Sequence, residues 1–135
     1  MTLSEYLAAL ARKRFVYGET DCLMILADWV FIRRGIDPAA HWRGTYHDEA
    51  GCRAALIAGR GIVHCIEAGL APLGIQRTSD PKHGDVGLVR TFIRRGDRAV
   101  LRKVGALCVS PNRWALMTDR GLVISEFQPV VAWSI

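Results

Sequence analysis

The order in which helical and strand patterns follow one another constrains this sequence most strongly. In the first half of the chain, apolar residues recur with helical spacing, and in the second half short apolar segments are separated by turn residues. Helix and strand patterns therefore do not alternate, as they would in a parallel α/β sheet. We expect an α+β fold in which N-terminal helices pack on a C-terminal antiparallel sheet.

The expected elements follow from caps, glycines and turn residues. Ser4 and Asp48 are candidate caps for the first and third helices, and Gly35 ends the second, which is apolar nearly all round and should be buried. The first expected helix covers 5–14, and the second starts at 21 or 22 and ends at 34. The third and fourth helices are expected at 49–58 and 62–68. The first expected strand starts at 86, and four further strands are expected at 100–109, 113–118, 122–126 and 130–134. The turns between them are expected at 95–97, 111–112 and 119–121.

Length and composition predict a single domain covering residues 1–135. Half of the 135 residues are hydrophobic, and no repeat, linker or low-complexity tract interrupts them, which excludes a disordered chain. No apolar run approaches the roughly 20 residues that cross a bilayer, and the N-terminus lacks the features of a signal peptide. We expect a chain that is made and folded in the cytoplasm and has no membrane span.

The net charge of +5 is concentrated in one segment, residues 90–103. This segment holds six basic residues and one acidic residue, so the rest of the chain is neutral. A basic hairpin on a neutral body favours one contact with an acidic partner, through residues such as Arg94, Arg95 and Arg98. A solvated loop without a partner is the alternative. Nucleic-acid binding is not expected, because the sequence has none of its motifs.

Cys22 is the strongest candidate for chemistry. A cysteine in the first turn of a helix lies where free backbone N–H groups and the helix dipole favour the thiolate, which a nucleophile requires. The alternative is a small buried residue that only packs. The four cysteines show no CxxC pair and no metal-ligand spacing, so we expect free thiols, no metal site and no cofactor.

Several short motifs occur in a characteristic order along the chain. They are Phe15-x-Tyr17-Gly18-x-x-Asp21-Cys22, Ala27-Asp28-Trp29, Gly35-x-Asp37-Pro38, Arg43-Gly44-x-Tyr46, Gly84-Asp85-Val86, Gly105-Ala106-Leu107-Cys108-Val109, Gly121-Leu122 and Ala132-Trp133-Ser134-Ile135. This order resembles the NlpC/P60 branch of the papain-like cysteine peptidases, and most closely a subgroup of phage and prophage proteins encoded among tail-tip genes. The resemblance implies a papain-like NlpC/P60-type fold with Cys22 at the position of the nucleophile.

The sequence departs from this family at the catalytic histidine. The family begins its second core strand with a histidine, and here the corresponding stretch starts at Lys103. A lysine is a cation near neutral pH and cannot accept the proton of a thiol unless it is strongly desolvated. Among the four histidines, His41 and His47 lie in a loop that could fold back towards Cys22 and supply a base.

The same loop contains candidate binding residues. Trp42, Arg43 and Tyr46 could bind a ligand together with Asp21, or they could seal the core beneath the helices. Arg43 could also pair with Asp28, which needs a partner if it is buried, and the loop would then be a latch over the second helix.

We expect a phage or prophage tail-tip protein that keeps a hydrolase fold without the standard catalytic histidine. Its partners would be other tail proteins, such as hub or distal tail proteins. It would be made in the bacterial cytoplasm and assembled into the virion tail. One alternative is an active hydrolase that cuts peptidoglycan peptides with Cys22 as nucleophile. Another is an assembly factor that never enters the virion.

Overall fold

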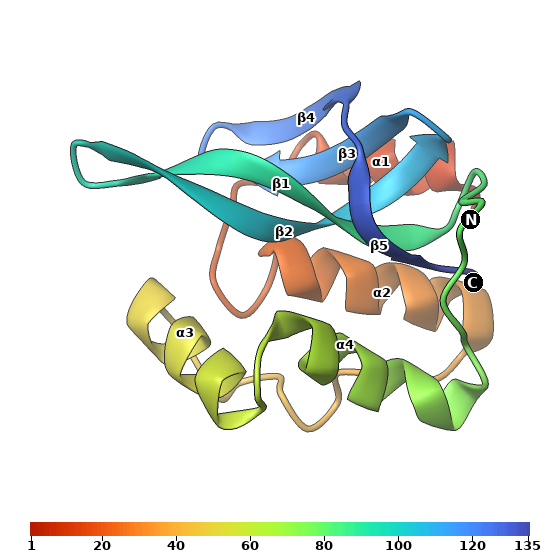
Figure 1. The fold of residues 1–135 in the computed structure, drawn as a ribbon, viewed down its shortest axis with the longest axis horizontal. Coiled ribbons are helices and arrows are strands. Elements are labelled where there is room, and N and C mark those ends of the chain that lie inside the picture. Colours follow the sequence, from red (N-terminus) through yellow and green to blue (C-terminus); the bar gives the residue numbers. More distant parts are fainter.

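The computed structural model describes all residues from 1 to 135 and has two layers, helices and an antiparallel sheet (Figure 1). The helices are α1 (Leu3–Leu10), α2 (Cys22–Arg34), α3 (Glu49–Ala58), α4 (Ile62–Leu70) and the short 3-10 helix η1 (Ala71–Leu73). The strands are β1 (Val86–Arg95), β2 (Arg98–Ser110), β3 (Arg113–Thr118), β4 (Gly121–Glu126) and β5 (Pro129–Trp133). All neighbouring strands in the order β4-β3-β2-β1-β5 are antiparallel, which confirms the α+β class.

Helix ends follow local side-chain chemistry at three predicted positions. Asp21 caps α2 by accepting hydrogen bonds from the backbone N–H groups of Leu23 and Met24, and Gly35 ends the helix in the left-handed region with φ 74°. Asp48 caps α3 through the N–H of Gly51. These starts and stops confirm the prediction, because each depends on residues within one turn of the helix end.

The predicted first helix is wrong at both ends. Thr2, not Ser4, is the cap, since its side chain accepts a hydrogen bond from the N–H of Glu5. The helix stops at Leu10 instead of Arg14. Residues 11–14 are exposed, so no packing holds a further turn in helical form.

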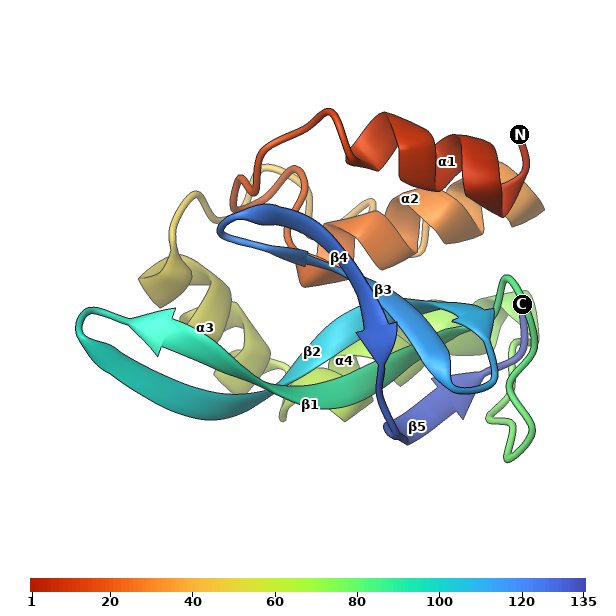
Figure 2. The ribbon, with the colours of Figure 1, turned by 90° about the horizontal axis from the view of Figure 1, so that it is seen from above.

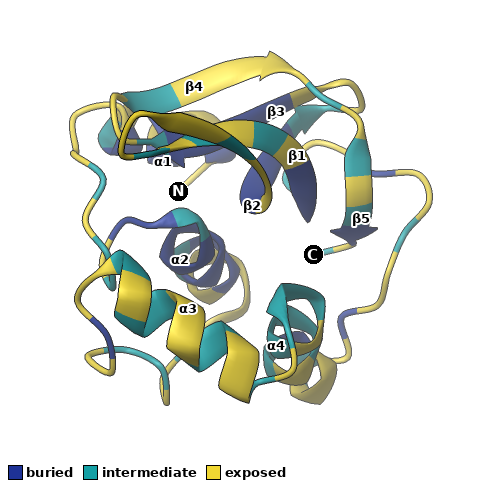
Figure 3. Cartoon of the chain, turned by 60° about the vertical axis from the view of Figure 1, so that its left-hand side comes forward, coloured by how far each residue is buried: buried dark blue, intermediate teal, exposed yellow.

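Two apolar clusters lie on opposite faces of the sheet. The larger joins α1 and α2 to one face, and it buries Trp29 and Trp133 as predicted. The smaller lies on the other face around Trp114, which leaves no room for a side chain at Gly87: a Cβ there would be 2.9 Å from the indole ring. Figure 3 shows α2 as the most buried helix, whereas α3 is exposed along much of its length.

The hairpin of β1 and β2 extends beyond the rest of the sheet (Figures 1 and 2). Pairing of β1 with β5 ends at Val89, and pairing of β2 with β3 begins at Leu107. Between these points the two strands pair only with each other, up to Arg95 opposite Arg98. We call residues 90–103 the basic hairpin. The predicted turn at 95–97 is confirmed, and Gly96 adopts φ 66° in it.

No single helix has both the length and the apolar character required to cross a membrane. The consecutive pair Glu49–Ala58 and Ile62–Leu73, bent by 71°, meets that test only when taken together and only by length and composition.

Candidate functional site: a cleft at the start of α2

A cleft of about 640 Å³ opens between the start of α2, helix α3 and the basic hairpin. The end of β3 closes its remaining side. Both polar and apolar residues line it, including Tyr17, Asp21, Cys22, Glu49, Cys52, Arg53, Leu56, Arg90, Phe92, Arg94, Leu101, Arg102 and Lys103. The structure thus brings Cys22 and Lys103, which are 81 positions apart in the chain, into one cavity.

The thiol of Cys22 is held in its neutral form. Burial raises its pKa to about 12, the hydrogen bond from the backbone of Gly105 opposes this, and the Asp21 carboxylate raises the pKa further. An activated cysteine nucleophile shows the opposite balance, with a pKa below the ordinary value. The position at a helix N-terminus therefore does not supply a thiolate here, because burial outweighs the hydrogen bonds from the backbone.

Contact between α2 and β2 at this point is very close. A Cβ on Gly105 would lie 2.2 Å from the carbonyl oxygen of Cys22 and 2.9 Å from a methyl group of Leu26. Only glycine fits, because any side chain would overlap the backbone of the helix. Lys103 lies two residues before Gly105 on the same face of β2, and its side chain therefore starts on the side of Cys22.

No histidine lines this cleft. His41 lines a smaller apolar pocket that α2 and α4 help to form, and its ring contacts Trp42 edge to face, with ring centroids 6.2 Å apart. His47 is exposed in the loop before α3. His64 is exposed on α4, and His83 forms a hydrogen bond with the carbonyl oxygen of Val109 at 2.8 Å. The structure brings neither His41 nor His47 to the thiol, so their role as base stays a prediction.

Asp21 joins three parts of the chain by hydrogen bonds: the start of α2, the turn at Gly18 and the loop that carries Tyr46. Its carboxylate is 2% exposed and accepts four hydrogen bonds, which fills its acceptor sites. The donors are the N–H groups of Leu23 and Met24 at 3.0 Å, the N–H of Gly18 at 2.7 Å and the hydroxyl of Tyr46 at 2.8 Å. Tyr46 is therefore tied to the start of α2, and no acceptor on Asp21 is left for a ligand.

Gly18 completes this arrangement. Its φ is +84°, and a Cβ there would lie 2.7 Å from the carbonyl oxygen of Tyr46. The glycine is required both by the turn and by the close approach of the 42–46 loop. Packing and hydrogen bonding at the start of α2 thus account for Gly18 and Asp21 of the Tyr-Gly-x-x-Asp-Cys motif without any catalytic demand.

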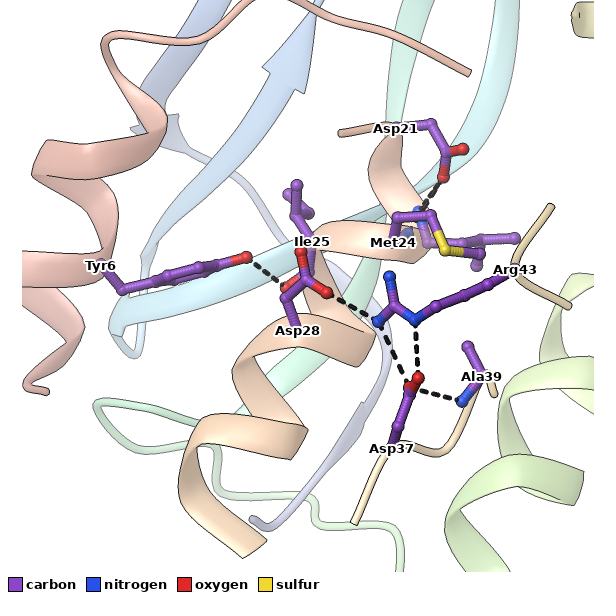
Figure 4. Close-up of polar contacts among 9 residues, drawn as sticks. Tyr6, Asp21, Met24, Ile25, Asp28, Asp37, Ala39 and Arg43 are labelled. Carbon is purple, nitrogen blue, oxygen red and sulfur yellow. Dashed lines mark hydrogen bonds and ion pairs between the residues drawn. The ribbon is translucent and has the colours of Figure 1, made fainter. Parts of the chain in front are cut away.

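Arg43 confirms the predicted latch over α2 (Figure 4). Its guanidinium contacts Asp28 at 2.6 Å and Asp37 at 2.6 Å, and it thereby joins α2 to the loop that follows it. The hydrogen bond from Arg43 is the largest cause that lowers the pKa of Asp37. Trp42 lines the small apolar pocket on this side of α2, away from the cleft.

A single ion pair links the basic hairpin to the helices. Arg95 contacts Glu49 of α3 at 3.0 Å, and the same carboxylate oxygen is 2.7 Å from Arg53. The other basic residues of the hairpin form no ion pair with any carboxylate; they are Arg90, Arg94, Arg98, Arg102 and Lys103. Five cations thus remain available to a partner. Arg95 is already paired with Glu49, and in this it differs from Arg94 and Arg98, with which the sequence groups it.

Four cleft residues on α3 were missed from the sequence: Glu49, Cys52, Arg53 and Leu56. Their spacing of three and four residues places them on one face of a helix, which is the only local signal that could have found them. Cys52 is also close to the Asp21 network, since its thiol interacts with Tyr46. Burial raises the pKa of this thiol to about 11.

Fold and cleft together define a small α+β domain with a cysteine at the start of a buried helix, beside an antiparallel sheet. A family model described as a domain of unknown function (DUF6950) matches residues 1–135, and the chain belongs to this family. No curated protein matches the chain. No solved structure matches it either.

Proposed function

We propose that this chain is a structural and interaction component of a phage or prophage tail tip, built on a papain-like NlpC/P60-type domain that has lost catalysis. The order of the motifs supports the assignment to this superfamily and to tail proteins. The architecture is compatible with it, since helices precede an antiparallel sheet and Cys22 opens the central helix.

One observation carries the loss of catalysis: the cleft around Cys22 contains Lys103 and no histidine. A thiol with a pKa near 12 needs a base within hydrogen-bond reach in order to attack a carbonyl. Lys103 is open to the cleft and exposed, and a lysine side chain offers hydrogen-bond donors and no acceptor, so it does not replace the missing histidine as a base.

The basic hairpin supports a role in binding. Its five unpaired cations lie on a part of the sheet that no other strand covers, and the remaining chain is electrically neutral. Such a localised charge favours association with an acidic neighbour in the tail.

A pair of matched double variants tests this role. Arg94→Glu with Arg98→Glu reverses two free cations of the hairpin, and Arg12→Glu with Arg120→Glu makes the same change in net charge at exposed sites elsewhere. We expect the hairpin variant to be absent from purified particles and the control to be incorporated normally. Equal incorporation of both variants would contradict the proposal. Absence of the unmodified protein from particles would favour the assembly factor.

An active cysteine hydrolase that cuts peptidoglycan is the second candidate. It is favoured by the position of Cys22, which lines an open cleft at a helix N-terminus. The N–H groups of Leu23 and Met24 are taken by Asp21, so the backbone N–H of Cys22 itself is the donor that would stabilise an oxyanion. The base would have to come from the loop that carries His41 and His47, which would need to move into the cleft.

Cys22→Ala distinguishes the two candidates, with Cys52→Ala as the control in the same cleft. The structural role predicts that particles with either variant are equally infectious. The hydrolase predicts that only Cys22→Ala abolishes the release of peptides from purified peptidoglycan while the protein stays folded.

A further inference from the structure

The basic hairpin has a free edge as well as free charges. Since β2 pairs with β3 only from Leu107 onward, the outer side of β2 between Arg98 and Ala106 has no neighbouring strand. The outer side of β1 is less open, because Arg95 at its end is held against Glu49 of α3. Figure 2 shows β1 on the α3 side of the hairpin tip and β2 on the side that faces away.

Hairpin register decides which backbone groups on this edge are free. Arg95 and Arg98 flank a two-residue turn, so they form a hydrogen-bonded pair and the pattern then alternates. The N–H and C=O groups of Ala99, Leu101 and Lys103 therefore point away from β1. Two contacts agree with this alternation. The Arg102 guanidinium donates to the carbonyl of Leu101 at 3.0 Å, and the N–H of Gly105 reaches the thiol of Cys22.

We propose that an acidic, extended segment of a partner protein adds to this edge as a further strand, alongside residues 98–103. This inference rests on the proposed function and specifies how the docking occurs. Backbone hydrogen bonds to Leu101 and Lys103 supply the pairing, as in other cases of strand addition.

Side chains on the edge define the sequence of the partner strand. Arg98, Arg102 and Lys103 are exposed and form no ion pair, so each fits a carboxylate directly opposite. Val100 and Leu101 lie between these cations, and Leu101 is 50% exposed. The complementary strand thus has two apolar residues opposite Val100 and Leu101, one further residue opposite Ala99, and acidic residues at both ends.

The same charges argue against a second copy of this chain as the occupant. Two such edges would place arginines and a lysine opposite one another, and like charges on neighbouring strands are unfavourable. Basic side chains on an exposed edge thus prevent self-association and leave pairing with an acidic strand open.

A synthetic hexapeptide tests strand addition directly. For antiparallel pairing it carries Glu at its first, second and last positions, with Val, Ile and Thr between them. Binding is followed by the amide chemical shifts of the ¹⁵N-labelled protein. We expect the largest changes at Leu101 and Lys103, and no binding of a peptide with Lys in place of Glu.

Two proline variants separate strand addition from simple charge attraction. Leu101→Pro removes a free N–H on the β2 edge, and Phe92→Pro, directly opposite in the hairpin, removes the corresponding N–H on the β1 edge. We expect Leu101→Pro to weaken peptide binding at least about 10-fold, because backbone pairing is lost, and Phe92→Pro to leave it within about 2-fold. Equal affinities for the two variants would overturn the proposal.

If Leu101→Pro does not fold, the peptide itself decides the question. A hexapeptide whose backbone N–H groups facing β2 are methylated keeps all its charges but cannot donate backbone hydrogen bonds to β2. We expect this peptide not to bind. Unchanged affinity of this peptide would overturn strand addition.

The outcomes also separate this inference from the proposed function. If reversal of Arg94 and Arg98 abolishes incorporation into particles but Leu101→Pro does not, the tail role stands and strand addition fails. If reversal of Arg94 and Arg98 has no effect on incorporation, the tail role fails whatever the peptide does.

Discussion

The start of α2 and the basic hairpin differ in how their polar groups are used. At the start of α2 the carboxylate of Asp21 is buried and fully hydrogen-bonded, and Gly18 and Gly105 permit contacts that no side chain would allow. In the hairpin, five cations have no ionic partner and one strand edge is open. The difference teaches that the most recognisable motif of the sequence maintains the fold, whereas the capacity to bind lies in a segment without a motif.

Gly105→Ala should produce the largest effect. The new methyl group would overlap the carbonyl of Cys22, so α2 and β2 would have to separate and the core between them would loosen. We expect a loss of about 3 kcal/mol in the free energy of unfolding, measured with urea. Ala99→Val, at an exposed site on the same strand, should change it by less than about 0.5 kcal/mol. A silent Gly105→Ala would mean that the contact is looser than described.

A comparison of two helix caps should give the next largest effect. Asp21→Ala removes an N-cap together with the bonds to Gly18 and Tyr46, whereas Asp48→Ala removes only the exposed cap of α3. We expect losses of about 2 kcal/mol for Asp21→Ala and about 1 kcal/mol for Asp48→Ala in urea unfolding. Similar losses would show that the Asp21 network adds nothing beyond a normal cap.

The pH dependence of Cys22 alkylation tests the neutral thiol. Because the pKa is raised to about 12, only a very small fraction of the thiol is ionised at pH 7, and the rate should keep rising with pH above 9. Rates for each cysteine follow from iodoacetamide labelling and peptide mass spectrometry of the unmodified protein. A plateau below pH 8 would identify an activated nucleophile and would favour the hydrolase.

Burial of the Cys22 thiol should also affect stability in alkali. Its pKa is raised on folding, so above an ordinary thiol pKa near 9 the unfolded chain loses a proton that the folded chain retains. The free energy of unfolding should therefore fall as pH rises above 9, and Cys22→Ala should reduce this slope. An unchanged slope would show that other groups dominate.

Charge changes in the hairpin should have the smallest effect on stability. Arg94→Glu with Arg98→Glu removes no ion pair, so the free energy of unfolding should stay within about 0.5 kcal/mol of the original value. A larger loss in urea unfolding would show that these cations stabilise the fold, and the contrast with the start of α2 would then fail.

Local chemistry explains which elements could be predicted. Asp21, Gly35 and Asp48 act on backbone within one turn, so the bounds of α2 and α3 followed from the sequence. The hairpin turn at Gly96 followed in the same way. The end of α1 did not, because it depends on whether residues 11–14 find a surface to pack against.

The candidate site could be predicted only in part. Cys22 and Lys103 were identified, and the structure places both in one cleft. The contribution of α3, through Glu49 and Cys52, could not be predicted, because it depends on how a helix without fully buried residues is placed against the hairpin. The structural role of Asp21, which the sequence suggested as a binding residue, also required the structure, since its partner Tyr46 comes from a separate segment.

The sequence by itself determined the α+β order, the principal caps and turns, and the concentration of charge in residues 90–103. Each of these is a property of neighbouring residues, and local sterics, hydrogen bonding and composition are enough to specify it. Only the tertiary structure decided that the Cys22 thiol is neutral, that Arg43 latches α2, and that β2 has a free edge. These properties depend on burial and on pairing between distant segments, and neither is fixed until the whole chain has packed.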